Sequence, residues 1–213
     1  MEKKQMKILT FNVGIIGTNC FLVTDEEAGE SVLIDPGTMS PRLETALKEH
    51  NVKHIILTHG HYDHILGVAE AKRITGADVI ISAEDAPCLY DDEKSRAGLH
   101  FPEPQEHLYA DRTVSDGDEI AFGNKKIRVV ATPGHTPGCV CYVFDEDGII
   151  FSGDTLFQGS IGRTDFATGS MSDMLSSLAK LKAIDGEFTV FPGHGPATDL
   201  SYEKQNNPYM RNL

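Results

Sequence analysis

A cluster of histidine and aspartate side chains occupies the short segment Thr58–His64, whose sequence is Thr-His-Gly-His-Tyr-Asp-His. Imidazole nitrogens and carboxylate oxygens are the donors that zinc binds in proteins, and iron and manganese accept the same mixture. A loop with one histidine is usually a solvated surface loop, but three histidines and an aspartate in one turn indicate a metal. The spacing therefore predicts a metal site that includes His59, His61, Asp63 and His64.

Three more candidate ligands each follow an apolar segment typical of a β-strand and lie beside glycine: His135, Asp154 and His194. Ligands that follow strands and are held by glycine turns would converge on one edge of a sheet. Together with the first cluster they make seven ligands, which is more than the four that a single zinc ion takes. We therefore expect two metals that share a bridging carboxylate, and Asp154 is the expected bridge.

Regular structure is expected on both sides of these ligands. The apolar run 54–57 is short and rich in β-branched residues, which predicts a buried strand, and helical spacing of apolar residues predicts a helix over 65–75. A helix over 41–50 is expected to be capped by Ser40 and to start at Pro41. The other expected elements are strands over 6–13, 18–25, 31–34, 78–82, 113–120, 125–131, 139–144, 149–152 and 188–191, and a helix over 171–184.

Several polar residues outside the cluster have simpler interpretations. Asp35 precedes Pro-Gly and is interpreted first as a turn former, with support of the metal site as the lesser alternative. Residues 83–112 show no clear periodicity, which is typical of a functional lid, and their His100 and His107 are interpreted as solvated. The four cysteines contain no C-x-x-C pair, and we expect reduced, buried core thiols.

Composition narrows the class of protein. The net charge of −13 argues against a nucleic-acid surface and against binding to an anionic membrane. The charged N-terminus has no apolar segment behind it, and no run approaches the roughly 18 apolar residues of a membrane span. We therefore expect a cytoplasmic protein. Because no linker or low-complexity segment divides the 213 residues, we expect one domain over 1–213.

The ordered motifs resemble those of the metallo-β-lactamase fold superfamily. They are the T-H-x-H-x-D-H segment at 58–64 followed by His135, Asp154 and His194. Within that superfamily the sequence is similar to the hydroxyacylglutathione hydrolases (glyoxalase II), through the segments 132–138, 153–157 and 192–194. The resemblance covers nearly the whole chain and implies an α/β fold, a four-layer αββα sandwich with the metals at one edge of its two sheets.

The resemblance also implies roles for the candidate ligands. His59, His61 and His135 would bind the first metal; Asp63, His64 and His194 would bind the second; Asp154 would bridge them. The expected cofactors are two Zn²⁺ ions per chain, with iron or manganese possible in one or both sites. Asp63 would also orient a metal-bound hydroxide that attacks the acyl carbon of a small acyl-thioester or ester.

The sequence departs from glyoxalase II in two respects. We expect no C-terminal glutathione-binding helical domain after His194, and Arg163 and Asp165 replace the lysine and tyrosine that family places near its substrate. Arg163 could still bind a substrate carboxylate. We expect a thioesterase acting on a small molecule as a monomer, with a dimer as the alternative, and no nucleic-acid or membrane partner.

Other functions remain compatible with parts of the sequence. The segment Gly162-Arg-Thr-Asp165 also resembles persulfide dioxygenases of this fold, which use one iron bound at positions matching His59, His135 and Asp154. A lactonase or esterase would use the same chemistry on an ester. A non-catalytic binding module stabilised by metal is the third alternative, although structural zinc sites are usually closed and rich in cysteine.

Overall fold

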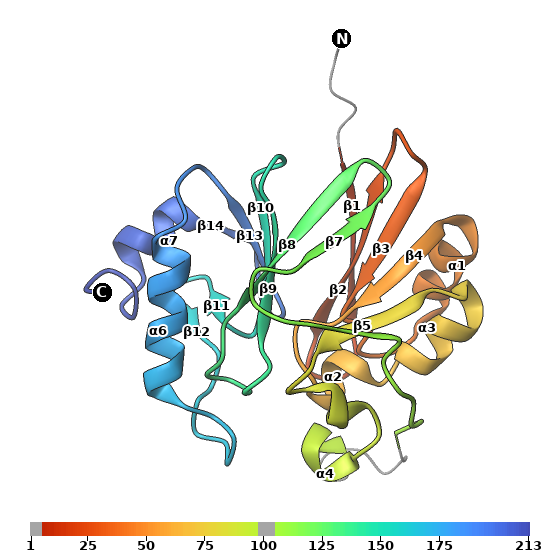
Figure 1. The fold of residues 1–213 in the computed structure, drawn as a ribbon, viewed down its shortest axis with the longest axis horizontal. Helices are drawn as coiled ribbons and strands as arrows, with labels where there is room; N and C mark the ends of the chain where they lie inside the picture. The colour runs from red at the N-terminus through yellow and green to blue at the C-terminus, as the bar shows by residue number, and fades with distance from the viewer. Residues whose placement is uncertain (1–5, 98–104) are drawn as a thin grey trace.

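Two β-sheets pack face to face and carry helices on their outer faces (Figure 1). The structure is a computed structural model that describes residues 6–97 and 105–213. Within these residues each of the two large sheets has six strands, in the orders β1-β2-β3-β4-β5-β6 and β14-β13-β10-β9-β8-β7. Helices α1 and α3 cover the first sheet, and α6 and α7 lie on the outer side of the second (Figure 1). The predicted αββα sandwich is confirmed.

The first sheet begins with an antiparallel meander and continues with parallel strands. Strands β1, β2 and β3 are antiparallel neighbours, whereas β3, β4, β5 and β6 run parallel. The parallel arrangement requires crossover connections, which α1 and α3 supply. The elements of this half are β1 (Lys7–Val13), β2 (Thr18–Asp25), β3 (Glu30–Ile34), α1 (Pro41–Glu49), β4 (Asn51–Ile56), α2 (Tyr62–Ile65), α3 (Val68–Thr75), β5 (Asp78–Ser82), the 3-10 helix η1 (Ala86–Leu89), α4 (Asp92–Ser95) and β6 (Arg112–Val114).

The second sheet is antiparallel except for one parallel pair. Strand β13 pairs with β10 in parallel, because α6 carries the chain back to the same end of the sheet. The elements of this half are β7 (Glu119–Phe122), β8 (Lys125–Ala131), β9 (Val140–Phe144), β10 (Ile149–Gly153), the small hairpin β11 (Leu156–Phe157) and β12 (Ser160–Ile161), α6 (Met171–Lys182), β13 (Thr189–Pro192), β14 (Thr198–Asp199) and α7 (Leu200–Asn206).

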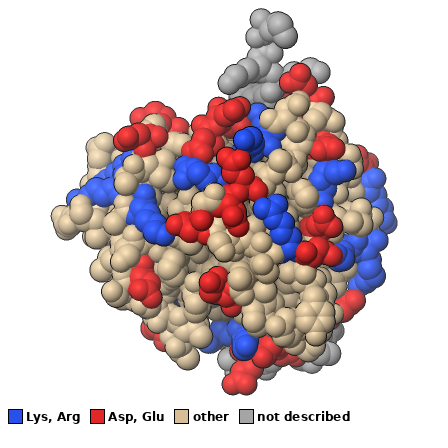
Figure 2. Space-filling model, viewed as in Figure 1, with Lys and Arg blue, Asp and Glu red and all other residues tan. Residues whose placement is uncertain are grey.

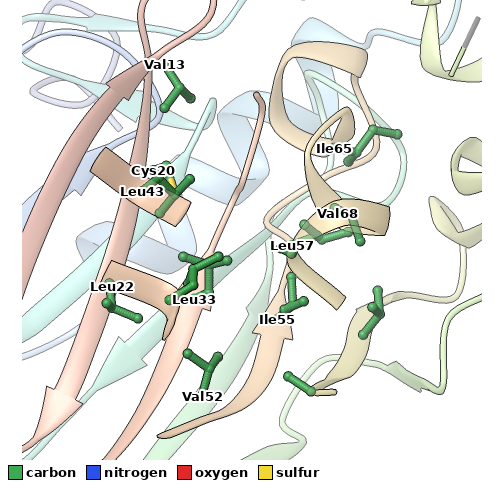
Figure 3. Packing of buried hydrophobic residues seen from close by; sticks show 14 of the residues in the cluster. Val13, Cys20, Leu22, Leu33, Leu43, Val52, Ile55, Leu57, Ile65 and Val68 are labelled. Carbon is green, nitrogen blue, oxygen red and sulfur yellow. The ribbon is translucent and has the colours of Figure 1, made fainter. Parts of the chain in front are cut away.

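Three layers of apolar side chains hold the sandwich together. Between the sheets, Phe21, Phe144 and Phe151 are buried, and the rings of Phe21 and Phe151 lie 4.9 Å apart. Leu33 and Leu43 belong to the layer between the first sheet and its helices (Figure 3). A third layer joins α6 to the second sheet. Since full burial of one such side chain contributes about 1.5–3 kcal/mol, these layers can hold a polar site rigidly at their edge.

Two predicted elements are each divided in the structure. The segment 113–120 forms parts of two strands, β6 and β7, which belong to different sheets. The predicted helix over 65–75 is divided into α2 and α3 at Gly67, and α2 begins earlier, inside the ligand cluster. The Gly67 N–H donates to the Pro36 carbonyl at 2.8 Å, and a Cβ there would lie 2.6 Å from that oxygen. Close packing of the backbone therefore interrupts the helix.

The segment predicted to be patternless contains short helices η1 and α4. Its His107 is exposed and lies 2.8 Å from the Asp92 carboxylate, whereas residues 98–104, including His100, lie outside the described residues. All four cysteines are buried and free, as expected. None of the described helices is long and apolar enough to cross a membrane. Acidic and basic side chains are interspersed on the face drawn in Figure 2.

Candidate metal centre

The seven candidate ligands meet at one edge of the sandwich because each follows or connects strands that end there. His59 and His61 follow β4 at the carboxyl end of the first sheet. Asp154 and His194 follow β10 and β13, which are parallel neighbours, so both side chains emerge at the same edge of the second sheet. His135 lies in the loop between β8 and β9. Both sheets therefore contribute ligands to one site.

Three histidines form the first group, and their ring nitrogens lie within 4.8 Å of one another: His59, His61 and His135. The Nδ1 atom of His61 is 2.8 Å from the Nε2 atom of His135. The ring centroid of His59 is 4.9 Å from that of His61 and 5.0 Å from that of His135. Three imidazoles converging on one point could hold a divalent cation.

The second group consists of Asp63, His64 and His194, whose donor atoms also lie within 4.8 Å of one another. Oδ2 of Asp63 is 3.2 Å from Nε2 of His64 and 3.2 Å from Nε2 of His194. Helix α2 holds Asp63 and His64 side by side, and the chain after β13 supplies His194. This group could hold a second cation.

The carboxylate of Asp154 lies between the two groups. Its Oδ1 is 3.5 Å from Nε2 of His64, and its Oδ2 is 3.4 Å from Nε2 of His135 and 3.6 Å from Nε2 of His194. It therefore faces one member of the first group and two members of the second. Of the seven candidate ligands it is the one placed to bridge two cations.

Unpartnered polar atoms test whether the site fits a metal. Within the described residues, Nε2 of His59, Nε2 of His64 and Oδ1 of Asp154 are buried and have no hydrogen-bond partner. A buried polar atom without a partner costs about 1–3 kcal/mol, so three at one place indicate a missing binding partner. The donors are nitrogen and oxygen without sulfur, which suits zinc, iron or manganese. The residues fit a pair of divalent cations.

The electrostatics of the site also favour cations. Burial raises the pKa of Asp63, but the charge of His64 and the close approach of the His194 and His64 rings outweigh it and hold that pKa well below its usual range. Burial lowers the pKa of His64, but Asp63, Asp154 and Asp35 raise it far more. The same carboxylates that would hold a proton on His64 would stabilise a metal ion.

The first group is electrostatically different. Burial and the neighbouring His135 lower the pKa of His61 to about 3, and burial and His64 lower the pKa of His59 strongly. Neutral imidazoles are the form that binds a metal, since a protonated nitrogen has no free lone pair. At neutral pH these two histidines are therefore uncharged, which is the form that can bind a cation.

Asp35 lies in a turn, where its carbonyl accepts from the Gly37 N–H at 2.8 Å, and its side chain also supports the candidate-ligand turn, which was the lesser of its two interpretations. Its carboxylate accepts hydrogen bonds from the Thr58 backbone N–H at 2.8 Å and from the Thr58 hydroxyl at 2.6 Å. Its Oδ2 is also 2.9 Å from Nδ1 of His64. Its backbone is left-handed, with φ of 50°. A carboxylate behind a ligand histidine fixes the orientation of the ring and raises its basicity.

Asp85 is a supporting residue that the sequence did not reveal. It is buried after β5, and its carboxylate accepts from the N–H groups of Gly60 at 2.8 Å and Gly138 at 3.0 Å and from the Thr136 hydroxyl at 2.6 Å. It thus joins the loop of His59 and His61 to the loop of His135. In the sequence it is one acid among several in a polar segment.

We expect the substitution Asp85→Asn to destabilise the protein by about 2 kcal/mol. Both carboxylate oxygens of Asp85 accept hydrogen bonds, and the amide NH₂ group that replaces one of them cannot accept, so a buried donor would lose its partner. Urea unfolding of the metal-free protein measures this change without interference from metal binding. The matched control is Asp78→Asn at the exposed start of β5, for which we expect a change within about 0.5 kcal/mol. Equal unfolding midpoints for the two variants would contradict the role of Asp85.

Two further contacts orient candidate ligands. The Thr18 hydroxyl donates to Oδ2 of Asp63 at 2.9 Å, and Nδ1 of His135 is 2.8 Å from the carbonyl oxygen of Arg163. The space around the ligands is also restricted, because a Cβ on Gly193 would lie 2.4 Å from Oδ1 of Asp154. The candidate ligands are thus held in place by hydrogen bonds and close packing within the protein.

A pocket of about 750 Å³ opens over the candidate ligands. Arg163, the expected substrate contact, lines it, but its guanidinium forms two hydrogen bonds of 2.9 Å with Asp165. Both side chains are about two-thirds exposed. The other described residues that line the pocket are Ile16, His61, Tyr62, Asp63, Arg96, His135, Asp154, Phe157, Ile161, Asp165, Phe166, Ala167 and His194. The pocket could admit a small molecule to the site.

An αββα sandwich with a histidine and aspartate cluster at the edge of both sheets defines a class of metal-dependent proteins. The sequence profile of the Metallo-beta-lactamase superfamily matches residues 13–194, and the chain belongs to that superfamily. A curated relative, the hydroxyacylglutathione hydrolase GloC of Haemophilus influenzae, is 32% identical over 96% of this chain and 98% of the relative. A probable metallo-hydrolase of Bacillus subtilis, YqgX, has the same identity and coverage.

Solved structures show the same similarity. The B3 metallo-beta-lactamase BLEG-1 superposes with a TM-score of 0.90 and 31% identity, covering 96% of this chain and 99% of the other. TTHA1623 in a di-iron-bound form gives a TM-score of 0.83 and 30% identity over 94% of this chain and 99% of the other. ETHE1 from Myxococcus xanthus gives a TM-score of 0.79 and 28% identity, covering 97% of this chain and 85% of the other. The relatives include hydrolases and a protein that holds two irons.

Proposed function

We propose that this protein is a dinuclear metal-dependent hydrolase that cleaves a small acyl-thioester. The observation that carries the proposal is the Asp154 carboxylate, which lies between two complete groups of ligands. His59, His61 and His135 would hold the first cation, and Asp63, His64 and His194 would hold the second. A structural metal site would need only one closed group of four ligands.

Two divalent cations in this site would lower the pKa of water from 15.7 toward 7 and polarise a carbonyl oxygen as Lewis acids. The protein supplies the positions of the reacting groups. Asp63 accepts a hydrogen bond from the Thr18 hydroxyl, which fixes its carboxylate. The same carboxylate would orient the attacking water. Asp154 sets the spacing between the two ligand groups, and the pocket admits the acyl carbon to them.

The thioester is favoured as substrate for two reasons. The chain is similar over nearly its whole length to GloC, which is named as a hydrolase of hydroxyacylglutathione, a thioester. A thiolate also leaves without a proton from a dedicated acid, and the described residues that line the pocket include no serine or cysteine nucleophile. The four cysteines are buried, and burial raises the pKa of Cys88 to about 12. These observations support a metal-activated water as the nucleophile.

The alternative of a mononuclear iron dioxygenase acting on persulfides rests on the segment Gly162-Arg-Thr-Asp165 and on His59, His135 and Asp154. These three side chains do lie together in the site. In that case His61, Asp63, His64 and His194 would have no metal to hold. The second group of ligands thus favours the hydrolase.

Purified zinc-loaded protein should be tested against four substrates in parallel: an acyl-thioester, a lactone, a β-lactam and a persulfide with oxygen uptake recorded. We expect thioester hydrolysis with kcat/KM above that for the lactone and β-lactam, and no oxygen consumption. Iron-loaded protein serves as the control for the persulfide reaction. Oxygen uptake without thioester cleavage would overturn the proposal.

A further inference from the structure

The pocket over the candidate metal centre has two chemically different ends. At one end the Phe166 ring makes edge-to-face contacts with two of the three histidine rings of the first group, with centroids 5.4 Å from that of His61 and 5.5 Å from that of His135. Two guanidinium groups lie against that ring, with Arg96 at 4.1 Å and Arg163 at 4.5 Å from its centroid. This end of the pocket therefore carries the two positively charged side chains, Arg96 and Arg163.

The opposite end is apolar. The Phe157 ring lies 6.2 Å from that of His194, in the second group of ligands. Ile16 also lines the pocket, and strand β2, which follows its turn, is joined to the His194 loop, because Asn19 donates from Nδ2 to the Gly195 carbonyl at 2.9 Å. An apolar part of a substrate would bind at this end, and a charged part at the other.

The two arginines are not equivalent. Asp165 occupies the guanidinium fork of Arg163 with two hydrogen bonds of 2.9 Å, so a substrate anion would have to displace that carboxylate. The backbone N–H of Arg96 donates to the Glu93 carbonyl, but its guanidinium makes no hydrogen bond or ion pair with any of the described residues. Arg96 is thus the guanidinium with free donors.

The backbone holds Arg96 in place over Phe166. Arg96 caps the C-terminus of α4 in the left-handed conformation, with φ of 67°, which residues other than glycine seldom adopt. Its neighbours Ser95 and Ala97 are buried and anchor it on both sides. A cation stacked on an aromatic ring keeps its edge donors free, because the stacking uses the face of the guanidinium.

We propose that Arg96 selects substrates whose thiol part carries a carboxylate, an inference that rests on the proposed thioesterase function. The free donors of Arg96 bind the carboxylate in a bidentate manner. The acyl part lies against Phe157 and Ile16 over the second group of ligands. The charged end is assigned to the thiol because the rim at Arg163 is open to solvent, so a long carrier can extend outward there.

Two measurements test this assignment. The first is kcat/KM for the acetyl thioesters of 3-mercaptopropanoate and of 3-mercaptopropanamide, which differ in charge and not in shape. The second is the binding, by calorimetry to zinc-loaded protein, of the corresponding S-propyl thioethers, which cannot be hydrolysed. In each case the quantity of interest is the ratio of the value for the carboxylate to that for the carboxamide.

We expect Arg96→Met to lower both ratios about tenfold and Arg96→Lys to lower them less, since lysine keeps the charge but not the fork. The control Lys94→Met removes an exposed charge from α4, the helix that precedes Arg96, and should leave the ratios unchanged. If Arg96 only packed against Phe166, its loss would weaken both partners of a pair equally and the ratios would not change, which would overturn the inference.

The two arms separate this inference from the proposed function. If no thioester is cleaved but the binding ratio still depends on Arg96, the thioesterase proposal fails and Arg96 remains the anion-binding residue. If thioesters are cleaved and neither ratio responds to Arg96→Met, the inference fails while the hydrolase stands. A larger response to Arg163→Met than to Arg96→Met would likewise overturn it.

Discussion

Replacement of Asp154 by asparagine is expected to lower kcat of thioester hydrolysis by about a thousandfold. The carboxylate lies 3.4–3.6 Å from ligand nitrogens of both groups, so its charge would serve both cations at once. A neutral amide donates instead of accepting at one of its two positions and cannot bridge. Loss of several kcal/mol of charge stabilisation corresponds to a rate change of this size.

The Asp154→Asn protein should also hold fewer metal ions per chain than the wild type, measured in the same preparation. Circular dichroism checks that the variant is folded, and Asp165→Asn, a pocket aspartate outside both ligand groups, serves as the comparison for metal content. A variant that keeps two metals and more than about a tenth of the wild-type kcat would contradict the bridging role.

Removal of metal by a chelator should abolish hydrolysis and lower the melting temperature by roughly 10 °C. A ligand that binds only the folded state, present at about a thousand times its Kd, stabilises it by about 4 kcal/mol, and each kcal/mol shifts a chain of this length by about 2–4 °C. Without cations, the buried atoms of His59, His64 and Asp154 have no partner, so the folded state loses that stabilisation.

Calorimetric scans of the same protein before and after chelation measure the shift. Added zinc or iron should restore activity and stability, whereas magnesium should not, because it prefers oxygen ligands and five of the seven candidate ligands are histidines. Unchanged activity after complete removal of metal would rule out the proposed chemistry.

Much of the fold could be predicted from the sequence because its signals are local. The run before Thr58 is apolar and β-branched, and the strand β4 lies there. Ser40 followed by Pro41 predicts the start of α1, and the Ser40 hydroxyl accepts from the Leu43 N–H at 3.2 Å. The candidate ligands were found in the same way, since metal donors at short spacing next to strand ends are visible without a structure.

The remaining features depend on contacts between distant parts of the chain. In the sequence, Asp35 and Asp85 resemble ordinary polar loop residues. The fold brings Asp35 to Thr58, 23 residues away, and Asp85 to Gly60, 25 residues away, so both support the loops that carry the candidate ligands. Arg96 lies in a segment without periodicity, and only its contact with Phe166 places it in the pocket. The division of 113–120 between two sheets likewise follows from packing of the whole sandwich.

The measurement that tests the central claim most directly is the metal content of protein purified without added metal, determined by elemental analysis as atoms per chain. We predict a value near two, mostly zinc with iron or manganese as the remainder, since two complete ligand groups flank Asp154. A value near one, consisting of iron and leaving Asp63, His64 and His194 without a metal, would contradict the dinuclear hydrolase.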